Sequence, residues 1–128
     1  MKVNKRIKPT ESELRILQLL WTYGPSTVKL VNEKLNEVKT TGYTTTLKLM
    51  QIMTQKKLLT RVAAGRQHIY KPLLPQKKAQ KDLLTNLAEA AFQGSAAKLV
   101  MQALGNSKTS KEELAEIKEL INKIERNK

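Results

Sequence analysis

Apolar residues recur at helical spacing in three runs within the first 57 residues, and polar or turn-forming segments separate the runs. The first run follows Thr10 and Glu13, which have the spacing of a capping box, and it stops at Gly24. The second run follows a cap at Ser26 or Thr27, and a polar loop comes after it. This pattern predicts two short helices and a loop ahead of a third helix.

The third run covers residues 44–57, within the sequence GYTTTLKLMQIMTQKKLL. A helix of this sequence has one buried stripe, which we expect to consist of Thr46, Leu49, Met50 and Met53. Positions 44, 47, 48, 51 and 55 then point away from that stripe. The run therefore predicts an amphipathic helix with threonines crowded at its start and an outer face that is polar apart from Leu47.

After residue 57 the apolar pattern changes from helical to strand-like. Residues 58–63 and 67–71 form two short runs, and Gly65 between them can supply the positive φ that a hairpin turn needs. Pro72 and Pro75 close the hairpin and begin a linker. Three helices followed by a hairpin is the order of a winged helix-turn-helix, whose third helix enters the DNA major groove.

The rest of the chain predicts three more helices, two of them over residues 77–92 and 96–104. After a loop at 105–109, Ser110 and Glu113 form a second capping box that begins the last helix. Three helices of this length bury little by themselves, so we expect a second copy of the chain to cover their apolar faces. The alternative is that these faces pack back on the N-terminal half. The residues expected to hold the dimer are Leu83, Leu87, Leu99, Leu114, Ile117, Ile121 and Ile124.

The sequence thus predicts a mainly α fold with a small β-hairpin. A winged helix-turn-helix DNA-binding domain is expected over residues 1–73 and a three-helix dimerisation domain over residues 74–128. Aromatic residues make up only 4% of the 128 residues, so we expect an aliphatic core.

The charge is concentrated in the first of these domains. The chain carries 24 lysines and arginines against 11 acidic residues, a net charge of +13. Residues 1–72 contain 14 basic and 4 acidic residues, a net of +10, and the remainder contains 10 and 7, a net of +3. This asymmetry favours a polyanion-binding unit joined to a separate assembly unit. The alternative is a generally lysine-rich, solvated surface.

On the outer face of the third helix, each residue type suits a contact with DNA. Thr44 and Thr45 sit at the helix N-terminus, where hydroxyl and backbone N–H groups can hold a phosphate. Lys48 can reach a phosphate or a guanine edge, Gln51 can pair with adenine, and Leu47 can touch a thymine methyl group. The alternative is that these side chains only solvate the helix. The hairpin adds four basic or polar residues that can follow the phosphate backbone: Arg61, Arg66, His68 and Lys71.

Composition excludes several other classes of protein. The chain has no cysteine, which excludes disulfides, thiol catalysis and cysteine metal sites and suits a reducing cytoplasm. His68 is the single histidine and is a poor metal ligand without cysteines or nearby carboxylates. No glycine-rich phosphate loop or paired apolar carboxylates suggest an enzyme, so we expect no cofactor and no catalytic residue. The basic N-terminus leads into no apolar segment, so we expect no signal peptide, and no 18-residue apolar run predicts a membrane helix.

Three stretches together carry a resemblance to a known family. PTESELRILQLLWTYGPSTVKLVNEKLN, GYTTTLKLMQIMTQKKLL and GRQHIYKP resemble the penicillinase repressors, a family that includes the methicillin-resistance repressor. AAFQGSAAKLVMQAL and SKEELAEIKELI fit as well, so the resemblance covers about residues 7–125. It implies a winged helix-turn-helix domain, a helical dimerisation domain and repression through palindromic operator DNA. It also implies pairing with a membrane sensor that has a zinc metalloprotease domain, whose signal leads to cleavage of the repressor.

The chain departs from the family pattern at four places. It lacks the cysteine pairs of the copper-responsive branch, so the resemblance does not extend to a copper response. The asparagine–phenylalanine pair that is cleaved in the resistance repressors aligns with Gln102 and Ala103, and cleavage there is an open alternative. Leu47 stands where those repressors have an arginine, and Lys57 stands where a glycine is usual. A winged-helix adaptor that binds protein, or a non-specific basic DNA-binding protein, is the alternative function.

Overall fold

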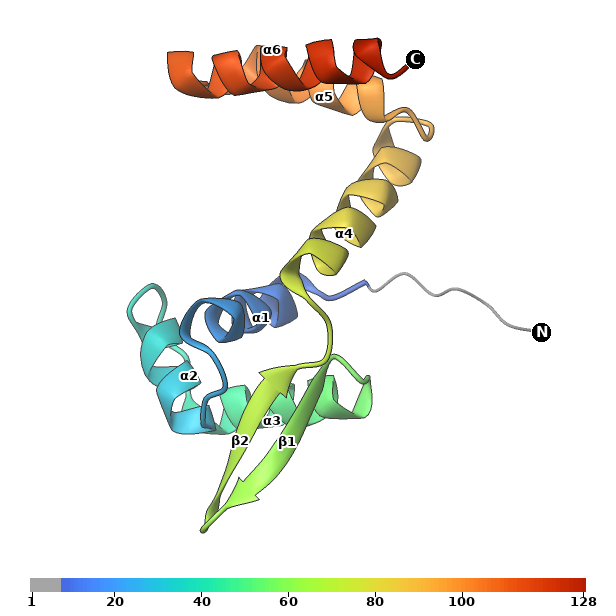
Figure 1. Ribbon diagram of the computed structural model, residues 1–128. Coiled ribbons are helices and arrows are strands. Elements are labelled where there is room, and N and C mark those ends of the chain that lie inside the picture. Colours follow the sequence, from blue (N-terminus) through green and yellow to red (C-terminus); the bar gives the residue numbers. More distant parts are fainter. Residues whose placement is uncertain (1–7) are drawn as a thin grey trace, which may run out of the picture. The chain divides into compact units, whose positions relative to one another are not determined.

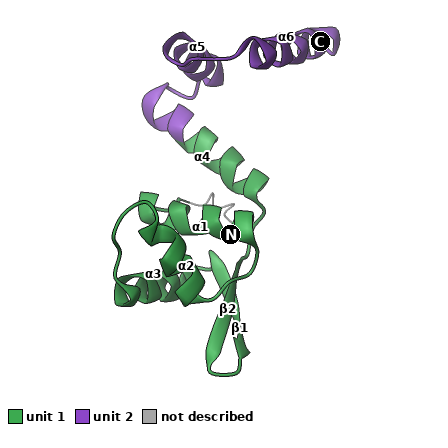
Figure 2. Cartoon of the chain, turned by 90° about the vertical axis from the view of Figure 1, so that its left-hand side faces the viewer, with its two compact units in different colours: residues 1–86 green, residues 87–128 purple. Residues whose placement is uncertain are grey.

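The structure is a computed structural model that describes residues 8–128 (Figure 1). Residues 1–7 lie outside this description, and the expectation about a signal peptide falls on them. The chain divides into two compact units, Met1–Asn86 and Leu87–Lys128 (Figure 2). This division falls inside a helix, further along than residue 73, and the predicted domain boundary stays a prediction.

Three helices open the first unit: α1 (Glu11–Tyr23), α2 (Val28–Asn36) and α3 (Tyr43–Gln55). The predicted capping box of α1 is confirmed, because the Thr10 hydroxyl accepts from the Glu13 backbone N–H and the Glu13 carboxylate accepts from that of Thr10. Thr27, not Ser26, caps α2 by accepting from the Leu30 N–H at 3.2 Å. α3 begins at Tyr43, one residue earlier than its threonine-rich start suggested.

The hairpin consists of β1 (Leu59–Ala64) and β2 (Gln67–Pro72), paired antiparallel with Arg61 opposite Tyr70. β1 begins and ends one residue later than its predicted range of 58–63, and β2 ends one residue later than its predicted range of 67–71. The turn contains two residues, and its first, Gly65, has a φ of 64°, a conformation that favours glycine. Ser26 extends the sheet by exchanging backbone hydrogen bonds with Tyr70, at 3.0 and 2.8 Å. This bridge fixes β2 against the loop between α1 and α2.

One hydrophobic core holds the three helices and the hairpin together. Thr46, Met50 and Met53 of α3 are fully buried, as the helical pattern predicted, whereas the fourth residue of the predicted stripe, Leu49, is half-buried. The expectation of a purely aliphatic core is wrong, because Tyr70 is the largest side chain that is fully buried. Each large apolar side chain in such a core contributes roughly 1.5–3 kcal/mol through burial. The buried members of the cluster are Ile16, Leu17, Leu20, Val28, Val31, Met50, Met53, Leu58, Leu59 and Tyr70.

The remaining helices are α4 (Gln76–Ala91), α5 (Ala96–Asn106) and α6 (Lys111–Arg126). Ser110 and Glu113 form the predicted capping box of α6. The predicted loop at 105–109 is wrong at its start, because α5 continues through Gly105 to Asn106. A single glycine lowers helix stability by only about 1 kcal/mol, too little to end a helix. None of the helices within residues 8–128 is long and apolar enough to cross a membrane.

Candidate nucleic-acid interface

The outer face of α3 is exposed and polar. Thr44, Thr45, Lys48, Gln51 and Gln55 are all exposed, at the spacing that places them on one side of the helix. Two threonine hydroxyls, one ammonium and two amides therefore stand together on a single helical surface. These groups provide hydrogen-bond donors and acceptors and a positive charge, which is the chemistry that contacts phosphates and base edges.

Leu47 differs from its neighbours on this helix. It is half-buried and packs against the hydrophobic core, so the expectation that it points away from the buried stripe is wrong. The reason is that residues of α2 and the hairpin lie beside it, and the remaining part of its side chain lines a cleft between these elements and the start of α3. Only part of its side chain is accessible beside the polar face.

Side-chain hydrogen bonds from α2 hold the start of α3. The Asn32 amide donates to the Thr41 carbonyl at 3.0 Å and to the Thr46 hydroxyl at 2.8 Å. The buried Thr46 hydroxyl donates in turn to the Gly42 carbonyl at 3.3 Å. Asn36 accepts from the Thr41 N–H at 2.9 Å. Because buried polar groups are costly when unpaired, this network fixes the angle between α2 and α3.

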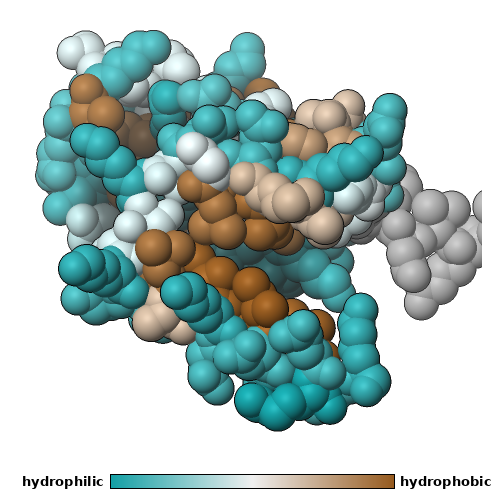
Figure 3. Space-filling model, turned by 90° about the horizontal axis from the view of Figure 1, so that it is seen from above, coloured by the Kyte–Doolittle hydropathy of each residue, from teal (hydrophilic) through white to brown (hydrophobic). Residues whose placement is uncertain are grey.

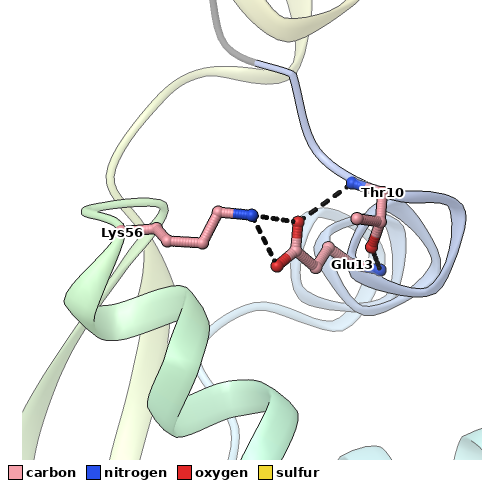
Figure 4. Close-up of polar contacts among 3 residues, drawn as sticks. All are labelled: Thr10, Glu13 and Lys56. Carbon is pink, nitrogen blue, oxygen red and sulfur yellow. Dashed lines mark hydrogen bonds and ion pairs between the residues drawn. The ribbon is translucent and has the colours of Figure 1, made fainter.

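An ion pair holds the opposite end of α3 against the start of α1. The Lys56 ammonium lies 2.8 Å from both carboxylate oxygens of Glu13, which is almost fully buried (Figure 4). Burial by itself raises the pKa of the Glu13 carboxyl, but the Lys56 ammonium and the Thr10 N–H together hold that pKa below its ordinary value of 4.5. Glu13 therefore both completes the capping box of α1 and anchors the end of α3.

Lys57 makes the turn from α3 to the hairpin. Its φ is 65°, in the left-handed region where side chains other than glycine are unfavourable. The Lys57 N–H donates to the Thr54 carbonyl at 3.1 Å, and the Leu58 N–H donates to the Met53 carbonyl at 2.9 Å. These two bonds form a Schellman motif, which commonly has glycine at this position.

The polar residues of the hairpin do not share one face. Arg61 and His68 lie on the same side as the buried Tyr70, because side chains alternate along each strand. The Arg61 guanidinium reaches the Tyr70 hydroxyl at 3.5 Å, and the rings of His68 and Tyr70 meet edge to face. Lys71 is on the opposite side of the sheet, and Arg66 is at the turn.

The cleft beside Leu47 brings Arg66 and His68 toward α2 and α3. It also contains two residues that the sequence analysis missed, Lys29 near the start of α2 and Tyr43 at the start of α3. Lys29 follows the Thr27 cap by two residues, and Tyr43 precedes the threonines directly. Their positions next to two predicted helix starts were the signal that could have identified them.

The predicted dimerisation residues are accessible within the C-terminal helices. Leu87, Ile121 and Ile124 are 50%, 50% and 48% exposed, which is high for large apolar side chains. Leu114 is 40% exposed, and Leu83, Leu99 and Ile117 are half-buried. Figure 3 shows apolar side chains gathered in a band with hydrophilic side chains around it. Large apolar side chains that are this exposed are candidates for an interaction site.

Gln102 and Ala103, at the position of the cleavage site in the resistance repressors, are both exposed in α5. Both residues are helical, with α5 continuing to Asn106. Residues 8–128 contain no group of three or more histidine, cysteine, aspartate or glutamate side chains that could hold a metal ion.

A model of the penicillinase repressor family matches residues 9–123. No curated protein sequence matches the chain. Among solved structures, a mutant of ZitR from Lactococcus lactis is 22% identical with a TM-score of 0.47, and the match covers all of this chain and 82% of that one. A MarR-like transcriptional regulator from Thermotoga maritima is 17% identical with a TM-score of 0.49, covering 94% and 77%. The PcaV transcriptional regulator from Streptomyces coelicolor is 16% identical with a TM-score of 0.48, covering 92% and 75%.

Proposed function

The chain belongs to the penicillinase repressor family and is a transcriptional regulator of the winged-helix type; from that premise we propose that it is a dimeric repressor of a palindromic operator. The family consists of regulators, and the proposal assigns the chain no catalytic step. Repression follows from occupation of promoter DNA. The observation that carries the proposal is the polar face of α3, exposed along its length and fixed at both ends.

In this proposal α3 lies in the major groove. Lys48 and Gln51 face the base edges, and Thr44 and Thr45 hold a phosphate at the helix start. Tyr43 and Lys29 extend the contact along the backbone, because both border the cleft next to α3. Leu47 contributes at most an apolar edge against a thymine methyl group.

The hairpin serves as the wing. Arg66 and His68 approach the backbone from the cleft side, and Lys71 approaches it from the other face of the sheet. Arg61 supports the wing through Tyr70 as well as adding charge. The exposed basic residues of the wing supply a contact that is independent of sequence and sensitive to salt.

The C-terminal helices form the dimer in this proposal. Residues 1–73 bind DNA, and residues 74–128 join two copies through the apolar faces of α4, α5 and α6. Two linked DNA-binding units bind a two-fold operator more tightly than one, because the second contact occurs at high effective concentration. Loss of the dimer therefore relieves repression.

A membrane sensor with a metalloprotease domain is the proposed source of the inducing signal, through cleavage at Gln102–Ala103. The pair is exposed, which supports access, but it lies in a helix. Because a protease requires an extended substrate, cleavage needs the end of α5 to unfold first. We expect α5 to unwind more readily than α3, since none of the α5 side chains is buried.

A gel shift with the promoter region of the chain's own gene tests the function, at two salt concentrations and beside a scrambled duplex. Specific retention of the promoter is the expected result, and footprinting then gives the half-site spacing. Equal, strongly salt-dependent binding to both duplexes would instead indicate a non-specific basic protein. Binding to neither would favour a winged-helix adaptor.

A further inference from the structure

A groove on the surface of the first unit is lined by none of the exposed polar residues of α3. It runs between α1 and the end of α2, has a volume of about 330 Å³, and is mostly apolar. Leu19 and Leu35 line it and are half-buried against the core. Tyr23 and Val38 also line it and are 52% and 91% exposed. We call this surface the α1–α2 groove.

The exposed valine is the unusual feature of this groove. Val38 follows the end of α2 by two residues and leaves nearly all of its side chain in water beside three other apolar residues. Apolar surface grouped around a concave site is the form that small-molecule pockets take, and their volumes begin at roughly 300 Å³.

Cations border the groove on both sides. The Arg15 guanidinium lies 2.8 Å from the exposed Glu11 carboxylate. Lys34 lies 3.3 Å from Glu37 and 4.8 Å from the centre of the Tyr23 ring. Lys39 makes no side-chain hydrogen bond or ion pair with any residue from 8 to 128. Arg15 and Lys34 each already pair with a carboxylate of the protein. The cations at the edge of the groove therefore have the charge and the geometry to bind a carboxylate.

The α1–α2 groove continues toward the start of α3. A second hollow shares Arg15, Leu35 and Lys39 with it and extends to Gly42 and Thr45 at the start of α3. A molecule in the α1–α2 groove that pairs with Arg15 and Lys39 therefore lies beside the loop that leads into α3. The same loop is held by the amide groups of α2.

We propose that the α1–α2 groove binds a small amphiphilic carboxylate and that its occupation weakens DNA binding. The apolar body lies on Leu19, Leu35 and Val38, and the carboxylate pairs with Lys39 and Arg15. The effect on DNA binding rests on the proposed function, whereas the binding of the carboxylate does not.

The direction of the effect follows from electrostatics. A bound anion neutralises Lys39 and adds negative charge near Thr45, where the operator phosphates approach. By linkage, DNA must weaken the binding of the carboxylate by the same factor. Screening at physiological salt limits the effect to neighbouring phosphates, since the Debye length is about 8 Å.

Decanoate is the probe, titrated into the full-length protein without DNA and followed by amide chemical shifts in NMR spectra. Decanol and decylamine have the same apolar chain without the negative charge. We expect saturable shifts within residues 15–23 and 34–42 for decanoate, and binding about tenfold weaker for decanol and decylamine. Lys39→Ala and Val38→Ser should each weaken decanoate binding about fivefold or more. Lys118→Ala, which removes an exposed charge from α6, should not.

No saturable shift, shifts confined to other residues, or equal binding of decanoate, decanol and decylamine would overturn the proposal. Binding of an acidic amphipathic peptide in place of decanoate would also overturn it, in favour of a protein partner. A gel shift with saturating decanoate then tests the coupling. Unchanged operator affinity would overturn the regulatory half alone, and failure to bind operator without decanoate would refute the proposed function instead.

Discussion

Lys48 stands in the middle of the exposed face of α3 and is the one cation among the five polar residues there. Replacing it with alanine removes a charge-assisted contact to a phosphate or a guanine edge. We expect Lys48→Ala to weaken operator binding by about 1–3 kcal/mol, roughly 5- to 150-fold, while the dimer stays intact. Fluorescence anisotropy with a labelled operator measures the affinity, and sedimentation measures the assembly.

The matched control for that change is Lys118→Ala, which removes an equal charge from α6. If the two variants lose affinity equally, net charge rather than the α3 face determines binding. If Lys48→Ala binds the operator with normal affinity at moderate salt, α3 is not the helix that recognises the DNA sequence.

Lys57 is a residue whose backbone conformation opposes its side chain. Its φ of 65° is unfavourable by roughly 1–2 kcal/mol for a residue other than glycine. Lys57→Gly should therefore raise the free energy of unfolding by about 1 kcal/mol, measured by denaturant titration, after the greater chain entropy of glycine is subtracted. Lys57→Ala keeps the unfavourable conformation and should give no such gain. If Lys57→Gly were less stable than Lys57→Ala, by the chain entropy of glycine, the turn would be unstrained.

Residue by residue, the sequence predicted what local periodicity determines. Thr46, Met50 and Met53 are buried and Lys48 and Gln51 exposed because they follow the 3.6-residue repeat of one helix. The prediction that Leu47 points outward was wrong because the neighbouring α2 and hairpin, not the helix itself, determine the burial of its side chain. The burial of Tyr70 and of Glu13 had no local signal in the sequence, because it depends on contacts far along the chain, such as the ion pair between Glu13 and Lys56.

At the scale of elements, Glu13 joins the start of α1 to the end of α3 across 43 residues of sequence. Its pKa is lowered in the folded state, so the unfolded state binds more protons as the pH falls. The stability contributed by this group is fully present above about pH 4.5 and is lost as the pH drops through the lower, folded pKa.

Glu13→Gln should therefore cost about 1–2 kcal/mol at neutral pH, because the Lys56 ammonium loses its charged partner. The difference between the two proteins should shrink as the pH falls below 4.5, measured by thermal or urea unfolding. Glu11→Gln is the control, because its ion pair with Arg15 is exposed and surface pairs contribute little. A constant difference across this pH range would mean that the ion pair contributes nothing.

The last helix carries an apolar stripe that the predicted dimer needs. Ile121→Asp places a charge in that stripe, and burying it in a dimer costs on the order of several kcal/mol. We expect the variant to sediment as a monomer and to bind operator weakly while its α-helical circular dichroism persists. Asn122→Asp adds the same charge on another side of α6 and should stay dimeric. If Ile121→Asp also stays dimeric, α6 does not form the interface.

Elements with local signals were the most predictable. Both capping boxes and the Gly65 turn lie within a few residues of their own elements, and the structure contains all three. Helix ends without such signals differ from their predicted positions. α5, for example, continues past Gly105, because a single glycine is often not enough to end a helix. The Asn32–Thr46 hydrogen bond could not be predicted, because it depends on how α2 and α3 cross.

For the whole molecule, the uneven distribution of charge should determine how strongly the proposed DNA binding depends on salt. Residues 1–72 carry a net charge of +10, and most of the side chains proposed to contact the backbone are exposed. If the two units of a dimer together neutralise roughly ten phosphates, the logarithm of the binding constant should fall with the logarithm of salt concentration at a slope near −9. Anisotropy titrations from about 50 to 200 mM salt measure this slope.

The Ile121→Asp monomer, with a single unit on the DNA, should give about half the slope. An unchanged slope in that variant would mean that one unit makes all the phosphate contacts, and a slope near zero in the intact protein would remove electrostatics from the mechanism.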